Sequence, residues 1–204
     1  AGKLKVISRY GVGYDKVELQ SARKQQIAVT ITPGANGDSV ADLAVALMLA
    51  CARNIPFMDQ RIKSRNQTRP PGVEMWEKTL GIVGAGRIGK GVAWRCRGFG
   101  MKILCYDQFQ DQKFARECPA EYVDLETLIR GSDFITIHSP LTPETRGMFG
   151  SRQFQMMKKD AILVNTARGG IVDEKALYEA LKDGEIRAAG LDATEAEPPY
   201  DSPL

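Results

Sequence analysis

Residues 79–89 read TLGIVGAGRIG, an apolar run that passes into three regularly spaced glycines. Gly84, Gly86 and Gly89 fit the pattern G-x-G-x-x-G, and the segments before and after it have the compositions of a strand and a helix. The first glycine of this pattern permits a tight turn, the second lets backbone amides approach a diphosphate, and the third lets the helix pack closely on the strand. The stretch therefore predicts a dinucleotide site, with the phosphates at the positive end of the helix dipole.

An acidic residue supports this interpretation. Asp107 closes the next apolar segment, about 20 residues after the glycines, where a carboxylate accepts hydrogen bonds from the adenosine ribose. The alternative is an ordinary turn-forming aspartate, but the strand, loop and helix that precede it favour the binding role. Since a carboxylate repels a 2′-phosphate, and residues 108–110 (Gln-Phe-Gln) offer no arginine to neutralise one, we expect NAD rather than NADP.

Apolar segments alternate with helical ones throughout the rest of the chain. The pattern indicates a parallel sheet covered by helices on both faces. We expect strands at residues 79–83, 103–106, 134–137, 162–164 and 188–191, and helices at residues 88–99, 125–129, 151–157 and 175–182.

The N-terminal region is organised differently. Two β-type segments, residues 4–8 and 27–31, flank a helical segment at 16–26, and so few elements cannot bury a core alone. We expect a helix at residues 39–53, with Asp38 or Ser39 as its N-cap. Its middle is apolar on all sides, so it must be covered by its own fold or by a partner chain.

The composition narrows the classes of function. The chain has 204 residues, 43% of them hydrophobic and 26% charged, with a formal net charge of +3. Its longest uncharged apolar run, residues 43–52, is shorter than the roughly 20 residues of a membrane span. The mild charge, and the absence of aromatic residues among the basic ones at 61–72, favour an exposed connection over a nucleic-acid site.

Metal-binding side chains are sparse. One histidine and four widely spaced cysteines give no metal-site pattern, and we expect the cysteines to be reduced thiols. Residues 1–7 have the composition of a strand rather than of a secretory signal. Together these features predict a cytoplasmic protein.

Several motifs beyond the glycine loop occur in a fixed order over nearly the whole chain. Together they resemble the D-isomer-specific 2-hydroxyacid dehydrogenase family, and within it the 3-phosphoglycerate dehydrogenase-like members. The matching segments are residues 10–13 (YGVG), 36–53, 79–89, 138–142 (HSPLT), 165–174 (NTARGGIVDE) and 192–198.

The resemblance implies the fold class and the reaction. It implies an α/β protein in which residues 35–204 form a Rossmann doubly wound parallel sheet, after a remnant of a flavodoxin-like substrate domain in residues 1–34. It implies hydride transfer between NAD and a small D-2-hydroxy or 2-oxo acid, and serine biosynthesis as the setting of the phosphoglycerate type. A homodimer formed through the helix at 39–53 is also expected.

The resemblance also implies the site residues. Arg168 matches the catalytic arginine, whose forked, permanently charged guanidinium suits a carboxylate and the reacting oxygen. Glu197 is selected over Glu195 by its spacing from Asp192, and it matches the glutamate that orients a catalytic histidine and raises its pKa. The alternatives are a surface arginine and a solvated acidic run. The positions that touch the dinucleotide in this family correspond to Val12, Gly84, Gly86, Arg87, Ile88, Gly89, Asp107, His138, Ser139, Pro140, Thr145, Thr166, Ala167, Arg168 and Asp192.

His138 is the chain's one histidine, yet it matches a cofactor-side turn rather than the general acid. The family's catalytic histidine follows the Glu-Pro pair at a distance that lies beyond Leu204. We therefore expect the NAD-binding domain of a longer protein, with little or no turnover alone.

Two other functions remain open at this stage. One is a glyoxylate or hydroxypyruvate reductase, although many of these prefer NADP, which Asp107 disfavours. The other is an NAD-sensing interaction module similar to the corepressors that share this fold. Arg168 and Glu197 do not discriminate, because those relatives keep both residues.

Overall fold

A computed structural model describes residues 3–204, whose contacts divide the chain into two compact units, Ala1–Ser39 and Val40–Leu204. Ala1 and Gly2, part of the segment expected to be a strand, lie outside the described residues. In the first unit the parallel strands β1 (Val6–Ser8) and β2 (Ala28–Thr30) flank helix α1 (Leu19–Lys24), which is shorter than expected.

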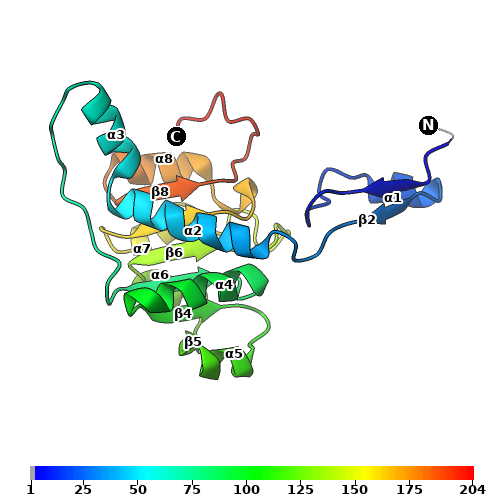
Figure 1. The fold of residues 1–204 in the computed structure, drawn as a ribbon, viewed down its shortest axis with the longest axis horizontal. Coiled ribbons are helices and arrows are strands. Elements are labelled where there is room, and N and C mark those ends of the chain that lie inside the picture. Colours follow the sequence, from blue (N-terminus) through cyan, green and yellow to red (C-terminus); the bar gives the residue numbers. More distant parts are fainter. Residues whose placement is uncertain (1–2) are drawn as a thin grey trace. The chain divides into compact units, whose positions relative to one another are not determined.

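The second unit contains a six-stranded parallel sheet (Figure 1). The strand order is β5-β4-β3-β6-β7-β8, which is the doubly wound order in which the chain starts near the middle and builds outward in both directions. This confirms the predicted fold class and the five predicted strands. The strands are β3 (Thr79–Val83), β4 (Lys102–Tyr106), β5 (Ala120–Tyr122), β6 (Phe134–Ile137), β7 (Ile162–Asn165) and β8 (Ala188–Leu191).

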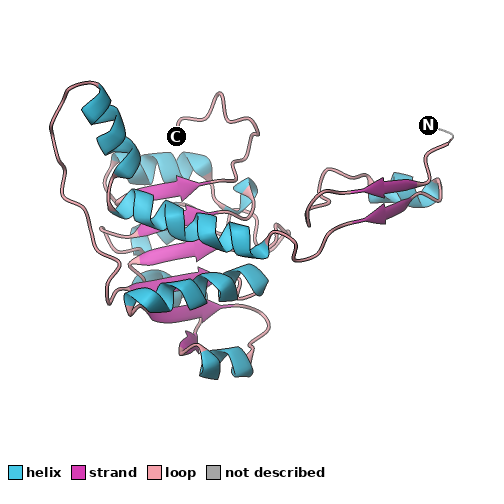
Figure 2. Ribbon diagram, in the orientation of Figure 1, coloured by secondary structure: helices cyan, strands magenta, loops and turns pink. Residues whose placement is uncertain are grey.

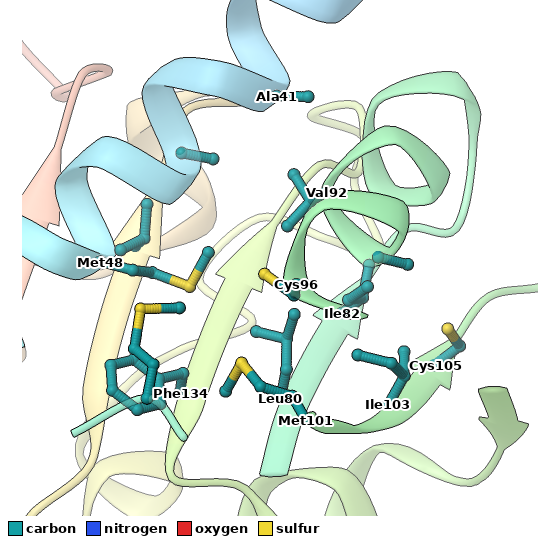
Figure 3. Packing of buried hydrophobic residues seen from close by; sticks show 14 of the residues in the cluster. Ala41, Met48, Leu80, Ile82, Val92, Cys96, Met101, Ile103, Cys105 and Phe134 are labelled. Carbon is teal, nitrogen blue, oxygen red and sulfur yellow. The ribbon is translucent and has the colours of Figure 1, made fainter. Parts of the chain in front are cut away.

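Helices cover both faces of this sheet (Figure 2). Because successive side chains of a strand point to opposite faces, Leu80 and Ile82 of β3 join one core and Val83 joins the other. Figure 3 shows the first core, between the sheet and helices α2 (Gly37–Ala52) and α4 (Arg87–Cys96). The second core lies beneath α6 (Leu125–Gly131), α7 (Ser151–Met156) and α8 (Glu174–Lys182).

Helix α2 begins at Gly37, so the prediction of Asp38 or Ser39 as its N-cap is wrong. Ala41, Ala44 and Met48 are fully buried on one face, whereas Leu43 is 37% exposed on another. The apolar middle of this helix is therefore covered on one side by its own fold.

Three elements were not expected from the sequence. Helix α3 (Ile55–Lys63) lies mostly before the stretch 61–72 that is expected to be an exposed connection and ends within it, and α5 (Gln112–Glu117) precedes the short edge strand β5. The signal for α5 was present in the sequence, because the Asp111 side chain caps it by accepting from the backbone N–H groups of Lys113 and Phe114. Two short 3₁₀ turns complete the unit, at Arg97–Phe99 and Gly169–Ile171.

Within residues 3–204, none of the helices taken singly has the length and apolar character needed to cross a membrane. The adjacent helices α2 and α3 reach those limits only as a pair, across a bend of 58°.

All four cysteines are free thiols. Cys96, Cys105 and Cys118 are buried, and desolvation raises the pKa of Cys96 and Cys105 to about 12. These thiols are therefore packing groups rather than nucleophiles.

Candidate functional site

The strand order reverses between β3 and β6, and the carboxyl ends of these two strands border the candidate site. Gly84 leaves β3 with a φ of +94°, a conformation that glycine adopts without strain. A Cβ at this position would lie 2.7 Å from the backbone nitrogen of Ser139 and 2.8 Å from the carbonyl carbon of His138. Gly84 thus lets the turns after the two strands touch backbone to backbone.

The other two glycines of the pattern have opposite surroundings. A Cβ on Gly89 would collide with the carbonyl oxygen of Gly84 and approach Cγ2 of Ile82 to 2.9 Å, so helix α4 packs directly on β3. Gly86, the N-cap of α4, has nothing within 4 Å of an added Cβ. The first turn of α4, which carries the predicted cofactor residues Arg87 and Ile88, therefore begins beside open space. Such a helix end, with its amides and positive dipole, suits the diphosphate of a dinucleotide.

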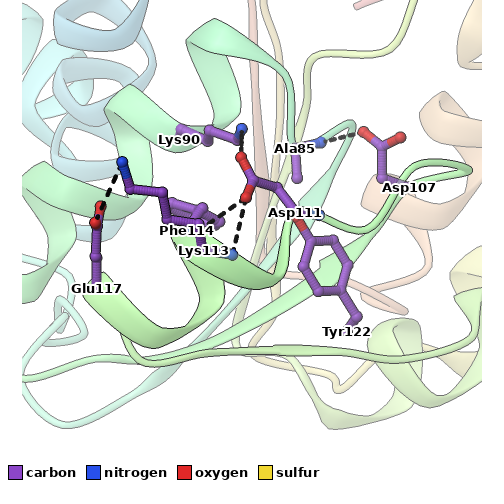
Figure 4. Close-up of polar contacts among 8 residues, drawn as sticks. All are labelled: Ala85, Lys90, Asp107, Asp111, Lys113, Phe114, Glu117 and Tyr122. Atoms are coloured by element: carbon purple, nitrogen blue, oxygen red, sulfur yellow. Dashed lines mark hydrogen bonds and ion pairs between the residues drawn. The ribbon is translucent and has the colours of Figure 1, made fainter.

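Asp107 faces the glycine loop (Figure 4). Its Oδ2 accepts from the backbone N–H of Ala85 at 2.7 Å, and its Oδ1 accepts from that of Phe109 at 2.9 Å. The half-buried carboxylate is therefore oriented by two fixed donors, as a residue that binds ribose hydroxyls requires.

An ion pair anchors the far end of the Asp107 loop. Lys90 Nζ of α4 lies 2.5 Å from Oδ2 of Asp111, and the backbone N–H of Asp111 donates to the Tyr122 hydroxyl at 3.1 Å. The hydrogen bond from Lys90, followed by backbone bonds, holds the pKa of Asp111 below its ordinary value. Because its partners lie 21 residues apart, no local pattern in the sequence predicts this pair.

His138 lies between two hydroxyl groups. Its Nε2 is 2.9 Å from the Oγ1 of Thr136, and its Nδ1 is 3.3 Å from the Oγ1 of Thr166, in the turn after β7. Burial lowers the pKa of His138 to about 4, so the ring is neutral at pH 7.

The turn after His138 is closed by Thr145, which is 9% exposed. Its hydroxyl donates to the carbonyl oxygen of Pro140 at 2.7 Å and accepts from the backbone N–H of Thr142 at 2.8 Å. These bonds fix the turn that follows Ser139, whose backbone nitrogen lies beside Gly84 at the carboxyl ends of β3 and β6.

Asn165 organises the loop that carries Arg168. The side-chain Nδ2 of Asn165 donates to the backbone carbonyl oxygen of Arg168 at 2.9 Å, and its Oδ1 accepts from the backbone N–H of Ala167 at 3.0 Å. The backbone carbonyl oxygen of Asn165 accepts from the backbone N–H of Asp192 at 3.0 Å. Asn165 is fully buried, and the motif that contains it does not by itself predict this role. Its place at the end of a buried strand was the available signal.

The Arg168 loop and the Glu197 segment meet at Gly169. A Cβ on Gly169 would collide with the backbone of Thr194 and Glu195, so these two segments of the chain are packed together there. Arg168 is half-buried, whereas Asp192 and Glu197 are exposed on the same edge of the sheet.

Val12 belongs to the first unit, where it lies half-buried in the loop after β1. Its assignment to the cofactor site stays a prediction.

Comparison with known proteins supports the interpretation of the second unit as an NAD-binding domain. A family model described as "D-isomer specific 2-hydroxyacid dehydrogenase, NAD binding domain" matches residues 45–204. The chain is 50% identical to D-3-phosphoglycerate dehydrogenase of Methanocaldococcus jannaschii and 47% identical to glyoxylate reductase of Korarchaeum cryptofilum. Each match covers 100% of this chain, but only 40% and 64% of those two relatives.

A solved structure shows the same fold. D-lactate dehydrogenase from Aquifex aeolicus, described as complexed with NAD and lactic acid, superimposes with a TM-score of 0.86 at 36% identity. The superposition covers 97% of this chain and 60% of that one.

The environment of His138 generates a prediction. Since the chain has one histidine, NMR titration of its imidazole has one assignable signal, and we expect a midpoint near pH 4. The unfolded chain takes up a proton near pH 6.5 that the folded protein does not bind, so stability falls as the pH drops from 6.5 toward 4.

Denaturant unfolding of wild type and His138→Gln across this pH range isolates the contribution of His138 to the free energy of unfolding. The variant should lose less stability than wild type as the pH falls, because it lacks the titrating ring. A midpoint at pH 6 or above would contradict the desolvated ring between two hydroxyl groups.

Proposed function

The chain belongs to the D-isomer-specific 2-hydroxyacid dehydrogenase family and carries its NAD-binding domain, and from this premise we propose that the protein transfers a hydride between NAD(H) and a D-2-hydroxy or 2-oxo acid. The observation that carries the proposal is the open amino end of α4 beside a carboxylate held toward the glycine loop. Residues 1–34 would contribute to a substrate domain and residues 35–204 would bind the cofactor.

We assign the cofactor contacts to groups at this edge of the sheet. Amides near Gly84 and Gly86 would hold the diphosphate, and Asp107 would accept from the adenosine ribose. NAD, when bound, supplies the acceptor or donor of the hydride. The turns at Ser139–Pro140 and Thr166–Ala167, with Asp192, would border the nicotinamide half.

Arg168 and Glu197 would act on the acid substrate. The guanidinium of Arg168 would bind the substrate carboxylate and stabilise negative charge on the reacting oxygen, and its charge does not titrate at working pH. Glu197 would orient the catalytic histidine that the family resemblance implies and would raise the pKa of that histidine. His138 suits neither acid nor base work near neutrality, because its pKa is about 4 and both ring nitrogens already have hydroxyl partners.

The substrate we propose is of the 3-phosphoglycerate type, which is the activity named for the relative at 50% identity. Glyoxylate reduction is the second candidate, because a relative of that name is 47% identical over the whole chain. We assign the same site residues for both candidates.

We further propose a homodimer formed through α2 and α3. Leu43 of α2 is exposed, and Ile55, Phe57 and Ile62 of α3 are 42–54% exposed, an apolar surface typical of an interface.

We place the protein in the cytoplasm because its four cysteines are free thiols.

Two glycine substitutions separate cofactor binding from folding. In Gly86→Ala the methyl group meets no protein atom, so the free energy of unfolding stays within about 0.5 kcal/mol of wild type, while NADH affinity falls by about 10-fold or more because the methyl group stands where the diphosphate approaches the backbone. Gly89→Ala loses about 1–3 kcal/mol of stability through its clash with Gly84.

Gly98→Ala is the control, since its Cβ also meets nothing within 4 Å and it lies in the 3₁₀ turn after α4. Isothermal titration calorimetry and urea unfolding give both quantities. Unchanged NADH affinity in Gly86→Ala would contradict the diphosphate position.

Cofactor choice tests Asp107. We expect wild type to bind NADH at least about 10-fold more tightly than NADPH, and Asp107→Asn to narrow that ratio by removing the charge that repels the 2′-phosphate. Glu121→Gln, which changes an exposed acid paired with Lys102, leaves the ratio unchanged. Calorimetry with both cofactors measures it, and tighter NADPH binding by wild type would overturn the assignment.

Turnover of the full-length protein tests the reaction. We expect a higher kcat/KM for the oxidation of 3-phospho-D-glycerate by NAD than for the reduction of glyoxylate by NADH. Arg168→Ala should lower kcat/KM by about 100-fold or more, and Arg168→Lys should not restore it because the forked geometry is lost.

Faster glyoxylate reduction would select the second candidate. An absence of turnover with every 2-hydroxy and 2-oxo acid, together with NADH-dependent capture of a partner protein, would favour the interaction module instead.

A further inference from the structure

A carboxylate is buried at the start of α8. Glu174 is 8% exposed, although it is the first residue of its helix and charged groups at such positions are ordinarily solvated. Asp173, not Glu174, caps the helix, since the Asp173 side chain accepts from the N–H of Ala176 at 3.0 Å. Burying Glu174 is costly unless donors surround it, so its partners indicate what it does.

Those partners lie in the chain segment 192–202. Oε1 of Glu174 accepts from the backbone N–H of Glu195 at 2.5 Å, and Oε2 accepts from the hydroxyl of Ser202 at 3.3 Å. The backbone N–H of Glu174 lies 3.5 Å from Oε1 of Glu195, so the two acids make reciprocal contacts. Hydrogen bonds to a charged acceptor are stronger than neutral ones.

The two attachment points lie on either side of Glu197. Strand β8 ends at Leu191, and the N–H groups of Asp192 and Ala193 still donate to the carbonyl oxygen of Asn165. Beyond them, the Glu174 carboxylate holds the segment at Glu195 and again at Ser202.

Glu174 is also tied to Arg168. The Arg168 loop continues through the 3₁₀ turn Gly169–Ile171 directly into α8, and Gly169 packs without space for a Cβ against Thr194 and Glu195. One short stretch of chain thus carries both Arg168 and the Glu174 carboxylate that holds the segment 192–202.

We propose that Glu174 is a positioning residue that holds the Glu197-bearing segment in register with the Arg168 loop. The inference rests on the proposed function for the roles of Arg168 and Glu197, but the anchoring itself follows from the contacts. A displacement of about 1 Å in a catalytic group can cost about 100-fold in rate, so the anchor affects turnover without touching substrate.

The discriminating variant is Glu174→Asp in the full-length protein. It keeps a negative charge at the amino end of α8, and so preserves the helix-dipole contribution, but its side chain is one methylene too short to reach Glu195 and Ser202. Glu179→Asp is the matched control, because Glu179 lies on the same helix and is exposed, where it pairs with Lys182.

In Glu174→Asp we expect amide hydrogen exchange in residues 193–202 to accelerate by about 10-fold or more, with exchange in α8 and β3 unchanged. NADH affinity should stay within about twofold of wild type, and kcat should fall by about 10- to 100-fold. Glu179→Asp should match wild type in all three measurements.

Unchanged exchange in residues 193–202 would overturn the anchoring, whatever happens to the activity. Faster exchange with unchanged kcat, or equal loss of protection in α8, would overturn the positioning role. If wild type turns over no 2-hydroxy or 2-oxo acid, the proposed function fails, while the exchange data still decide whether Glu174 holds the segment.

Discussion

The contact of backbone with backbone at the centre of the sheet is the constraint on which the second unit depends. Helix α4 can lie on β3 only because Gly89 presents no side chain to the carbonyl of Gly84, and the turns after β3 and β6 can touch only because Gly84 has none either. These two approaches set the positions of the helix end and of the neighbouring turn together. A site built from amides needs this precision, because amides cannot change rotamer to compensate for a shift.

Much of this unit could be predicted from residues close together in the sequence. The five predicted strands exist because each is an apolar run bounded by turn residues, and the sheet is parallel because helices separate them. The helix start at Gly37 and the elements α3, α5 and β5 were not predicted. These elements are short or peripheral, and a short element gives too few repeats of an apolar pattern to be recognised, although the Asp111 cap is a local signal for α5.

The candidate site was predicted where motifs carry it and missed where distant residues cooperate. Asp107 and the glycines belong to one local pattern. The Lys90–Asp111 pair, the bonds of Asn165 to two loops, and the burial of Glu174 become visible only when the chain is folded. A sequence shows which side chains could pair, but not which surfaces the fold places against them.

The orientation of Asp107 has a stoichiometric consequence. A carboxylate has about four lone-pair directions, and two of them are used by Ala85 and Phe109 among the contacts described. The remaining two equal the number of hydroxyl donors on an unmodified ribose. A sugar bearing a phosphate in place of one hydroxyl supplies only acceptors there, and so would leave one lone pair facing a like charge.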